Sequence, residues 1–202
     1  RVCDDVVKRI YERRKCRAGV RRHVLKGCFV KVLIDQEQIS SRVISLGREL
    51  ANEYQHRPLT IIGILAGSVV LLADLIRAID VPHQVGLIQA SSYRGKTTTA
   101  GALHVNLDFM PDIKGRHVLL VDDIFDTGKT MQTVLAQIRE LQPLSLKSAV
   151  LLWKEEASEV ELTPDFHCFK IPNHFVVGYG LDFNNEYRHL PFIASLEGTD
   201  LV

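Results

Sequence analysis

Apolar and polar positions along the chain follow two alternating patterns, which predict strands and helices in turn. Short apolar runs of strand length are separated by longer segments in which apolar residues recur every three or four positions. The runs span residues 32–34, 59–65, 85–90, 118–121 and 148–153. Strands that alternate with helices favour a largely parallel sheet covered on both faces, and therefore an α/β fold that binds its ligands at the carboxyl ends of the strands.

Three helical segments each predict one buried face. Asp35 is placed to cap the first helix, Ala66-Gly67-Ser68 turns into the second, and a loop ending at Thr130 leads into the third. The predicted faces are Ile39, Val43, Leu46 and Leu50; Val69, Leu72, Ala73, Ile76 and Ile79; and Met131, Val134, Leu135, Ile138 and Leu141. Residues 103–109 alternate apolar and polar side chains, which predicts a half-exposed strand.

Composition adds a size limit and an uneven charge. The 202 residues are 46% hydrophobic and 24% charged, enough for one sizeable domain, and no apolar run approaches the roughly 20 residues of a membrane span. Residues 1–27 carry ten Lys/Arg and three Asp/Glu, a net of +7, whereas residues 28–202 carry fifteen and twenty-one, a net of −6. We interpret residues 1–27 as a basic, poorly ordered extension and residues 28–202 as the working domain; contact with nucleic acid is the alternative for the extension.

The cysteines form no CxxC pair and no metal-ligand cluster. They are Cys3, Cys16, Cys28 and Cys168. We interpret them as free thiols in a reducing cytosol, and therefore expect a cytoplasmic protein.

A buried strand, two adjacent carboxylates and a Thr/Gly-rich loop stand together in residues 117–130. Asp122 and Asp123 come where the apolar run ends, and Gly128 allows the loop to turn tightly and approach a ligand. The first N–H groups of the following helix lack internal partners and suit a phosphate, with Thr127 and Thr130 as further donors. Carboxylates suit hydroxyl groups or a divalent cation, so a sugar phosphate satisfies both halves of the site.

Other interpretations of this loop explain less. Gly128-Lys129-Thr130 also ends the P-loop motif, but that motif requires a glycine at position 123, where this chain has an aspartate. Asp126-Thr127-Gly128 occurs in aspartic proteases, where no buried strand and amphipathic helix flank it. An ordinary strand–turn–helix would leave three carboxylates at one strand end unexplained.

Residues 117–130 resemble the phosphoribosyl-pyrophosphate (PRPP) binding motif of the type I phosphoribosyltransferases. Four further segments resemble the hypoxanthine–guanine branch of that family: Gly63–Ser68, Ser91–Tyr93, Leu151–Lys154 and Ile171–Arg188. The resemblance runs from Val32 to Arg188. It implies the family's fold, a mainly parallel twisted sheet flanked by helices, with a small hood of N- and C-terminal segments over the purine site.

The resemblance implies a role for each segment. Ribose 5-phosphate would be bound by Asp122, Asp123, Asp126, Thr127, Gly128, Lys129 and Thr130, with Asp126 as the catalytic base. Pyrophosphate would be bound by Ala66, Gly67 and Arg188, and the purine by Lys154, Phe175, Val176 and Asp182. Ser92 and Tyr93 would begin a flexible loop that closes over the site, and Mg²⁺ would meet Asp122, Asp123 and Asp182. Many family members have lysine where this chain has Ala66, so only backbone binding would survive there.

The implied activity is purine salvage, in which PRPP and hypoxanthine or guanine give IMP or GMP and pyrophosphate. Lys154 would donate to the 6-oxo group and so disfavour adenine, while the preference among hypoxanthine, guanine and xanthine is left open. Because the family forms dimers and tetramers, we expect a homodimer or homotetramer whose partners are small-molecule substrates, with no membrane or nucleic acid.

Related folds offer alternatives. RNA-binding attenuators of the same fold usually lack a carboxylate at the position of Asp126 and the C-terminal segment that resembles the purine site. PRPP synthetases are much longer chains with two lobes, and orotate or adenine transferases lack the pocket from Lys154 to Asp182.

Overall fold

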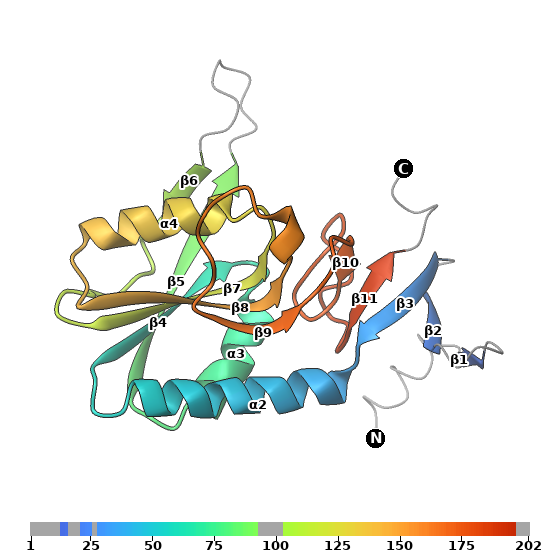
Figure 1. The fold of residues 1–202 in the computed structure, drawn as a ribbon, viewed down its shortest axis with the longest axis horizontal. Coiled ribbons are helices and arrows are strands. Elements are labelled where there is room, and N and C mark those ends of the chain that lie inside the picture. The colour runs from blue at the N-terminus through green and yellow to red at the C-terminus, as the bar shows by residue number, and fades with distance from the viewer. Residues whose placement is uncertain (1–12, 16–20, 26–27, 93–102, 197–202) are drawn as a thin grey trace, which may run out of the picture. The chain divides into compact units, whose positions relative to one another are not determined.

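The computed structural model describes residues 13–15, 21–25, 28–92 and 103–196. The chain divides into a smaller unit, Arg1–Ser40 with His174–Val202, and a larger unit, Ser41–Asn173 (Figure 1). Within the described ranges, no helix combines the length and the apolar character that crossing a membrane requires.

The larger unit contains the parallel sheet that the sequence predicts. Its strands are β6 (Leu103–Asn106), β5 (His83–Ser92), β4 (Leu59–Leu65), β7 (His117–Phe125), β8 (Ser145–Trp153) and β9 (Phe166–Lys170), in that spatial order. All neighbours from β5 to β9 are parallel, and β6 is antiparallel to β5. The α/β fold with a mainly parallel sheet is therefore confirmed.

Helices cover the sheet, and two of the three predicted faces are confirmed. In α2 (Gln36–Glu53) the whole predicted face is buried, and Asp35 caps the helix by accepting the N–H of Gln38 at 2.9 Å. In α4 (Lys129–Glu140) four of the five predicted residues are buried: Met131, Val134, Leu135 and Ile138. These four join a hydrophobic core that also includes side chains of β4, β7 and β8.

The predicted face of α3 (Val69–Ala78) is wrong at most of its positions, because Val69 and Ala73 are exposed and Ile76 is only partly buried. The residues of the helix that are buried are Leu71, Leu72 and Leu75, of which only Leu72 was predicted. The segment is apolar at almost every position, so its periodicity does not distinguish one face from the next. The packing against β4 and β7 selects the face.

Two strand boundaries also differ from the prediction. β7 does not end at Val121 but continues to Phe125, because Asp122 and Ile124 pair with β8. The acidic pair therefore lies within the strand. Conversely, β6 ends at Asn106 and residues 107–109 are not strand, because the side chain of Asn106 accepts the N–H of Asp108 at 2.8 Å and starts a turn.

The smaller unit combines both ends of the described chain in one antiparallel sheet. Its order is β1 (Arg13–Lys15), β2 (Arg21–Leu25), β3 (Cys28–Ile34), β11 (Ile193–Leu196) and β10 (Val176–Val177). A separate core packs within this unit, formed by Val177, Leu190, Phe192, Ala194 and Leu196. The N- and C-terminal segments thus form one sheet. β1 and β2 lie in residues 1–27, whose interpretation as a poorly ordered extension stays a prediction, as does the boundary at residue 28.

The observed face of α3 can be tested by stability. We expect Leu75→Ala to lower the free energy of unfolding by about 2–5 kcal/mol, because it leaves a cavity where a fully buried side chain stood. Val69→Ala should change it by less than about 0.5 kcal/mol, because Val69 is largely solvated. Urea denaturation of both variants measures the difference, and equal losses would contradict the assigned face.

Candidate active site

Three loops meet at the carboxyl edge of the larger unit's sheet because their strands are neighbours. β4, β7 and β8 are adjacent and parallel, so the residues that follow them emerge side by side. These residues are 66–68 after β4, 126–130 after β7 and 154–160 after β8. Segments far apart in the sequence thus form one candidate site within this unit.

The loop after β7 presents the N-terminus of α4. Gly128 is the N-cap residue and has φ +80°, and no side chain caps the helix there. The N–H of Gln132 makes the first helical hydrogen bond, to the carbonyl of Gly128 at 2.9 Å, so the N–H groups before Gln132 have no partner within the helix. The first turn also contains no acidic side chain. This end of α4 is suited to bind an anion.

The acidic pair lies beside that loop. Asp122 is only 8% exposed, and its Oδ1 accepts the N–H of Asp123 at 3.0 Å. Burial, and then the neighbouring charge of Asp123, raise the pKa of Asp122 well above its ordinary value. Two carboxylates thus share a site in which a hydroxyl donor or a cation would relieve their repulsion.

The loop after β4 approaches the second carboxylate closely. A Cβ at Gly67 would overlap Oδ2 of Asp123, so any other residue at position 67 would require the Asp123 carboxylate to move. The peptide bond between Leu65 and Ala66 is cis. The predicted pyrophosphate loop and the predicted ribose site are therefore in direct contact in this unit.

Asp126 and Lys154 form an ion pair, with Lys154 Nζ 2.9 Å from Asp126 Oδ2. The lysine side chain is only 7% exposed, whereas that of Asp126 is 46% exposed. The N–H of Lys154 also donates to the carbonyl of Phe125 at 2.9 Å, which ties the end of β8 to the end of β7. A carboxylate acceptor and an ammonium donor thus stand together beside the loop that leads into α4.

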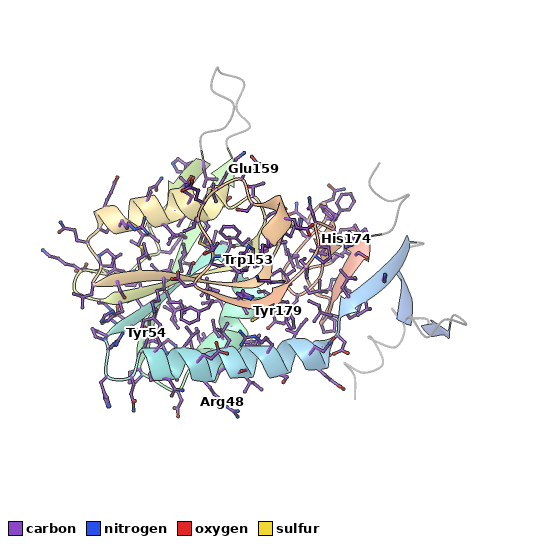
Figure 2. All side chains as sticks on the ribbon, in the orientation of Figure 1. Arg48, Tyr54, Trp153, Glu159, His174 and Tyr179 are labelled. Atoms are coloured by element: carbon purple, nitrogen blue, oxygen red, sulfur yellow. The ribbon has the colours of Figure 1, made fainter. Side chains whose placement is uncertain are left out.

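The sequence did not single out Glu159, labelled in Figure 2, or its neighbour Val160, although both contact the loop after β7. The N–H of Glu159 donates to the carbonyl of Thr127 at 3.0 Å, and its carboxylate pairs with Lys129. Val160 packs against Gly128. Only the strand order could have indicated these two residues. β7 and β8 are parallel neighbours, so the segment that follows β8 passes close to the loop that follows β7.

The residues predicted on the C-terminal side lie in the smaller unit. Phe175 is 43% exposed and packs edge-on against Phe183, with ring centroids 5.5 Å apart. Asp182 Oδ1 lies 2.8 Å from Nη2 of Arg188, whose Nη1 donates to the carbonyl of Gly180. Val176 is buried in β10, and its neighbour Val177 is core, as predicted.

The structure leaves part of the predicted site untested. Ser92 ends β5 but its side chain is not described, and Tyr93 lies outside the described residues. Among the described side chains, no three of His, Cys, Asp or Glu gather closely enough to hold a metal ion by themselves. The site roles therefore stay predictions.

Comparison with known proteins supports the resemblance. A model of the phosphoribosyl transferase domain matches residues 31–184. The hypoxanthine-guanine phosphoribosyltransferase of Streptococcus pneumoniae is 40% identical over 174 residues, which cover 86% of this chain and 97% of the relative. The hypoxanthine phosphoribosyltransferase of Salmonella typhimurium is 37% identical over 169 residues, which cover 83% of this chain and 95% of the relative.

Solved structures agree in fold and sequence. A crystal structure of a hypoxanthine phosphoribosyltransferase from Staphylococcus aureus superposes with a TM-score of 0.77 at 35% identity, covering 82% of this chain and 90% of the other. A variant of the Trypanosoma cruzi enzyme in a ternary substrates complex has a TM-score of 0.76 at 36% identity, covering 82% and 94%. The chain therefore belongs to the phosphoribosyltransferase family, in its hypoxanthine–guanine branch.

Proposed function

We propose that the protein transfers the 5-phosphoribosyl group of PRPP to hypoxanthine or guanine, releasing pyrophosphate and giving IMP or GMP for purine salvage. The observation that carries this proposal is the contact between Asp126 and Lys154 beside the anion-binding end of α4. A proton acceptor and a buried donor beside the predicted phosphate loop would suit the attack of a 6-oxopurine on a ribose phosphate.

The ribose 5-phosphate is bound by the loop from Asp126 to Thr130. The N–H groups at the start of α4 and the hydroxyls of Thr127 and Thr130 donate to the phosphate. Asp122 and Asp123 hold the ribose hydroxyls, and their negative field favours the positive charge that develops on the ribose ring as the bond to pyrophosphate breaks.

Proton transfer and purine choice are divided between two side chains. Asp126 accepts the proton that the purine loses at N7 as its other imidazole nitrogen attacks. Lys154 donates to the 6-oxo group, and its burial makes an unmatched partner costly. Adenine has an amino group at this position, so the Lys154 ammonium group would face another hydrogen-bond donor and would have no acceptor. Phe175 stacks on the purine, and the backbone of Val176 and the region of Asp182 meet the edge that carries N1 and the 2-substituent.

Pyrophosphate is stabilised by the backbone of Ala66 and Gly67 and by Arg188. The absence of a Cβ at Gly67 lets this loop pass close beside Asp123. Arg188 is held by Asp182 and by the carbonyl of Gly180, which orients its guanidinium group. Ala66 has no donor in its side chain, so this loop binds through its backbone alone.

The carboxylates of β7 fit a magnesium ion. Mg²⁺ prefers oxygen ligands and usually binds through one or two carboxylates together with substrate phosphates. Asp122 and Asp123 supply two such ligands, and Asp182 in the smaller unit is a further candidate. When bound, the ion would neutralise charge on the leaving pyrophosphate. We further propose a cytoplasmic location, a homodimer or homotetramer, and a flexible loop that begins at Ser92 and Tyr93.

A purine panel tests the proposed function. Incubation with PRPP, Mg²⁺ and each of hypoxanthine, guanine, xanthine, adenine and uracil should release pyrophosphate with hypoxanthine or guanine. For adenine, kcat/KM should be lower by about 5- to 100-fold or more, because an unpaired buried donor costs about 1–3 kcal/mol. No release with any 6-oxopurine would contradict the proposal.

Replacement of the proposed base separates chemistry from binding. We expect Asp126→Asn to lower kcat by about 10²- to 10⁴-fold, because general-base help is removed while the shape of the side chain is kept. The dissociation constant for PRPP should change far less. Single-turnover kinetics and equilibrium binding measure the two quantities, and near-normal turnover would overturn the assignment of Asp126.

The raised pKa of Asp122 predicts a pH-dependent gain in stability for Asp122→Asn. Folding favours the protonated carboxyl of Asp122 over the ionised one, because its pKa is higher in the folded protein than in the unfolded chain. The stability that the protonated carboxyl contributes is fully present below the unfolded pKa and is lost as pH rises through the folded pKa. Asparagine cannot ionise. With a chelator and no ligand, the variant should be more stable than the parent at about pH 8, and this gain should shrink towards pH ~4.

Urea denaturation across this pH range measures the gain, with the exposed Asp80→Asn as control. If Asp122→Asn gives the same gain at all pH values, or a loss at high pH, the electrostatic interpretation of the acidic pair is wrong.

A further inference from the structure

We propose that Glu159 and Val160 form a positioning element that holds the loop 126–130 in the geometry that binds phosphate. This inference rests on the proposed function in one respect, since it takes this loop as the site of the 5′-phosphate. The inference assigns a role to two residues that would act on the substrate only through this loop. Three contacts join them to the loop, and these contacts contribute unequally to holding its conformation.

The first contact restrains Gly128. An ideal Cβ at this glycine would overlap a methyl group of Val160 and would stand 2.6 Å from Cζ of Phe125. The α-carbon is therefore enclosed between the two side chains. Glycine has the widest conformational freedom of all residues, and its φ of +80° is only one of the values open to it. Val160 and Phe125 supply the restraint that the residue itself lacks.

The second contact orients the peptide group between Thr127 and Gly128. The carbonyl of Thr127 accepts the N–H of Glu159 at 3.0 Å, so it faces that segment. In a trans peptide the N–H points opposite to the carbonyl. The N–H of Gly128 is therefore turned away from Glu159, and it becomes available together with the N–H groups at the start of α4.

The third contact, the ion pair between Glu159 and Lys129, contributes little. The two side chains are 54% and 64% exposed, and exposed ion pairs are worth little in water. Packing and the backbone hydrogen bond therefore dominate the positioning.

The positioning element is itself anchored. The carbonyl of Val160 accepts the hydroxyl of Ser158 at 2.9 Å, and the N–H of Ala157 donates to the carbonyl of Lys154 at 3.1 Å. Val160 also packs against the core of the larger unit. The element thus connects Lys154, the proposed donor to the purine, with the loop 126–130, which is proposed to bind the ribose phosphate.

Val160→Ala tests the positioning role without removing a group that touches substrate. We expect the dissociation constant for ribose 5-phosphate and the KM for PRPP to rise about tenfold, because small misplacements of binding groups are costly. The KM for hypoxanthine and kcat should stay within about twofold, because the purine and base groups are untouched. Val160→Ile keeps the branched Cβ and should restore affinity for ribose 5-phosphate.

Two variants serve as controls. Val118→Ala makes the same change at a fully buried position at the other end of β7, so it lowers stability without touching the loop. Its affinity for ribose 5-phosphate should stay at the parent value. Glu159→Gln removes the ion pair but keeps the backbone hydrogen bond, and should change that affinity by less than about twofold.

The outcomes separate this inference from the proposed function. Equal binding of ribose 5-phosphate by the parent and Val160→Ala would overturn the positioning role, and so would an equal loss in Val118→Ala. A loss in Glu159→Gln as large as that in Val160→Ala would mean that the ion pair, rather than packing, holds the loop. Absence of transfer to any 6-oxopurine counts against the proposed function only, because ribose 5-phosphate binding is measured without a reaction.

Discussion

The parallel pairing of β7 with β4 on one side and with β8 on the other is the constraint on which the candidate site depends. It brings the loops after three strands to one edge of the sheet, with Gly67, Asp126 and Lys154 among their residues. A register shift by one residue would turn every side chain of a strand to the opposite face. The buried side chains on both faces of this sheet therefore also set the positions of the acidic pair and of the groups around it.

Two glycines at this edge of the sheet let other side chains pack directly against the backbone. At Gly67 the missing Cβ leaves room for the carboxylate of Asp123, and at Gly128 it leaves room for Val160 and Phe125 beside the N-terminus of α4. Glycine allows both approaches but holds neither conformation by itself. The neighbouring side chains that contact these glycines are Asp123 of β7 at Gly67 and Val160 at Gly128. If the loop before α4 binds phosphate as we propose, the site would depend on residues that need not touch the phosphate.

Sequence patterns predicted the elements well where burial has one clear period, and less well elsewhere. The face of α4 was clear because polar residues separate its apolar positions, whereas α3 is apolar on several sides and only packing selects Leu71, Leu72 and Leu75. The end of β7 was placed too early because Asp122 is a poor strand residue in isolation. The ladder to β8 extends the strand through it, and a non-local hydrogen-bond partner leaves no local signal.

The sequence by itself determined the α/β fold, the family, and the chemical character of the residues 122–130, since periodicity and motif spacing are local properties of the chain. Tertiary structure alone decided which of these residues meet. The ion pair of Asp126 with Lys154, the contact of Asp123 with Gly67 and the packing of Val160 on Gly128 each join segments that are far apart in the sequence. Such contacts follow from the order of strands in the sheet. Strand order is set by the packing of the whole core, which no local pattern of residues records.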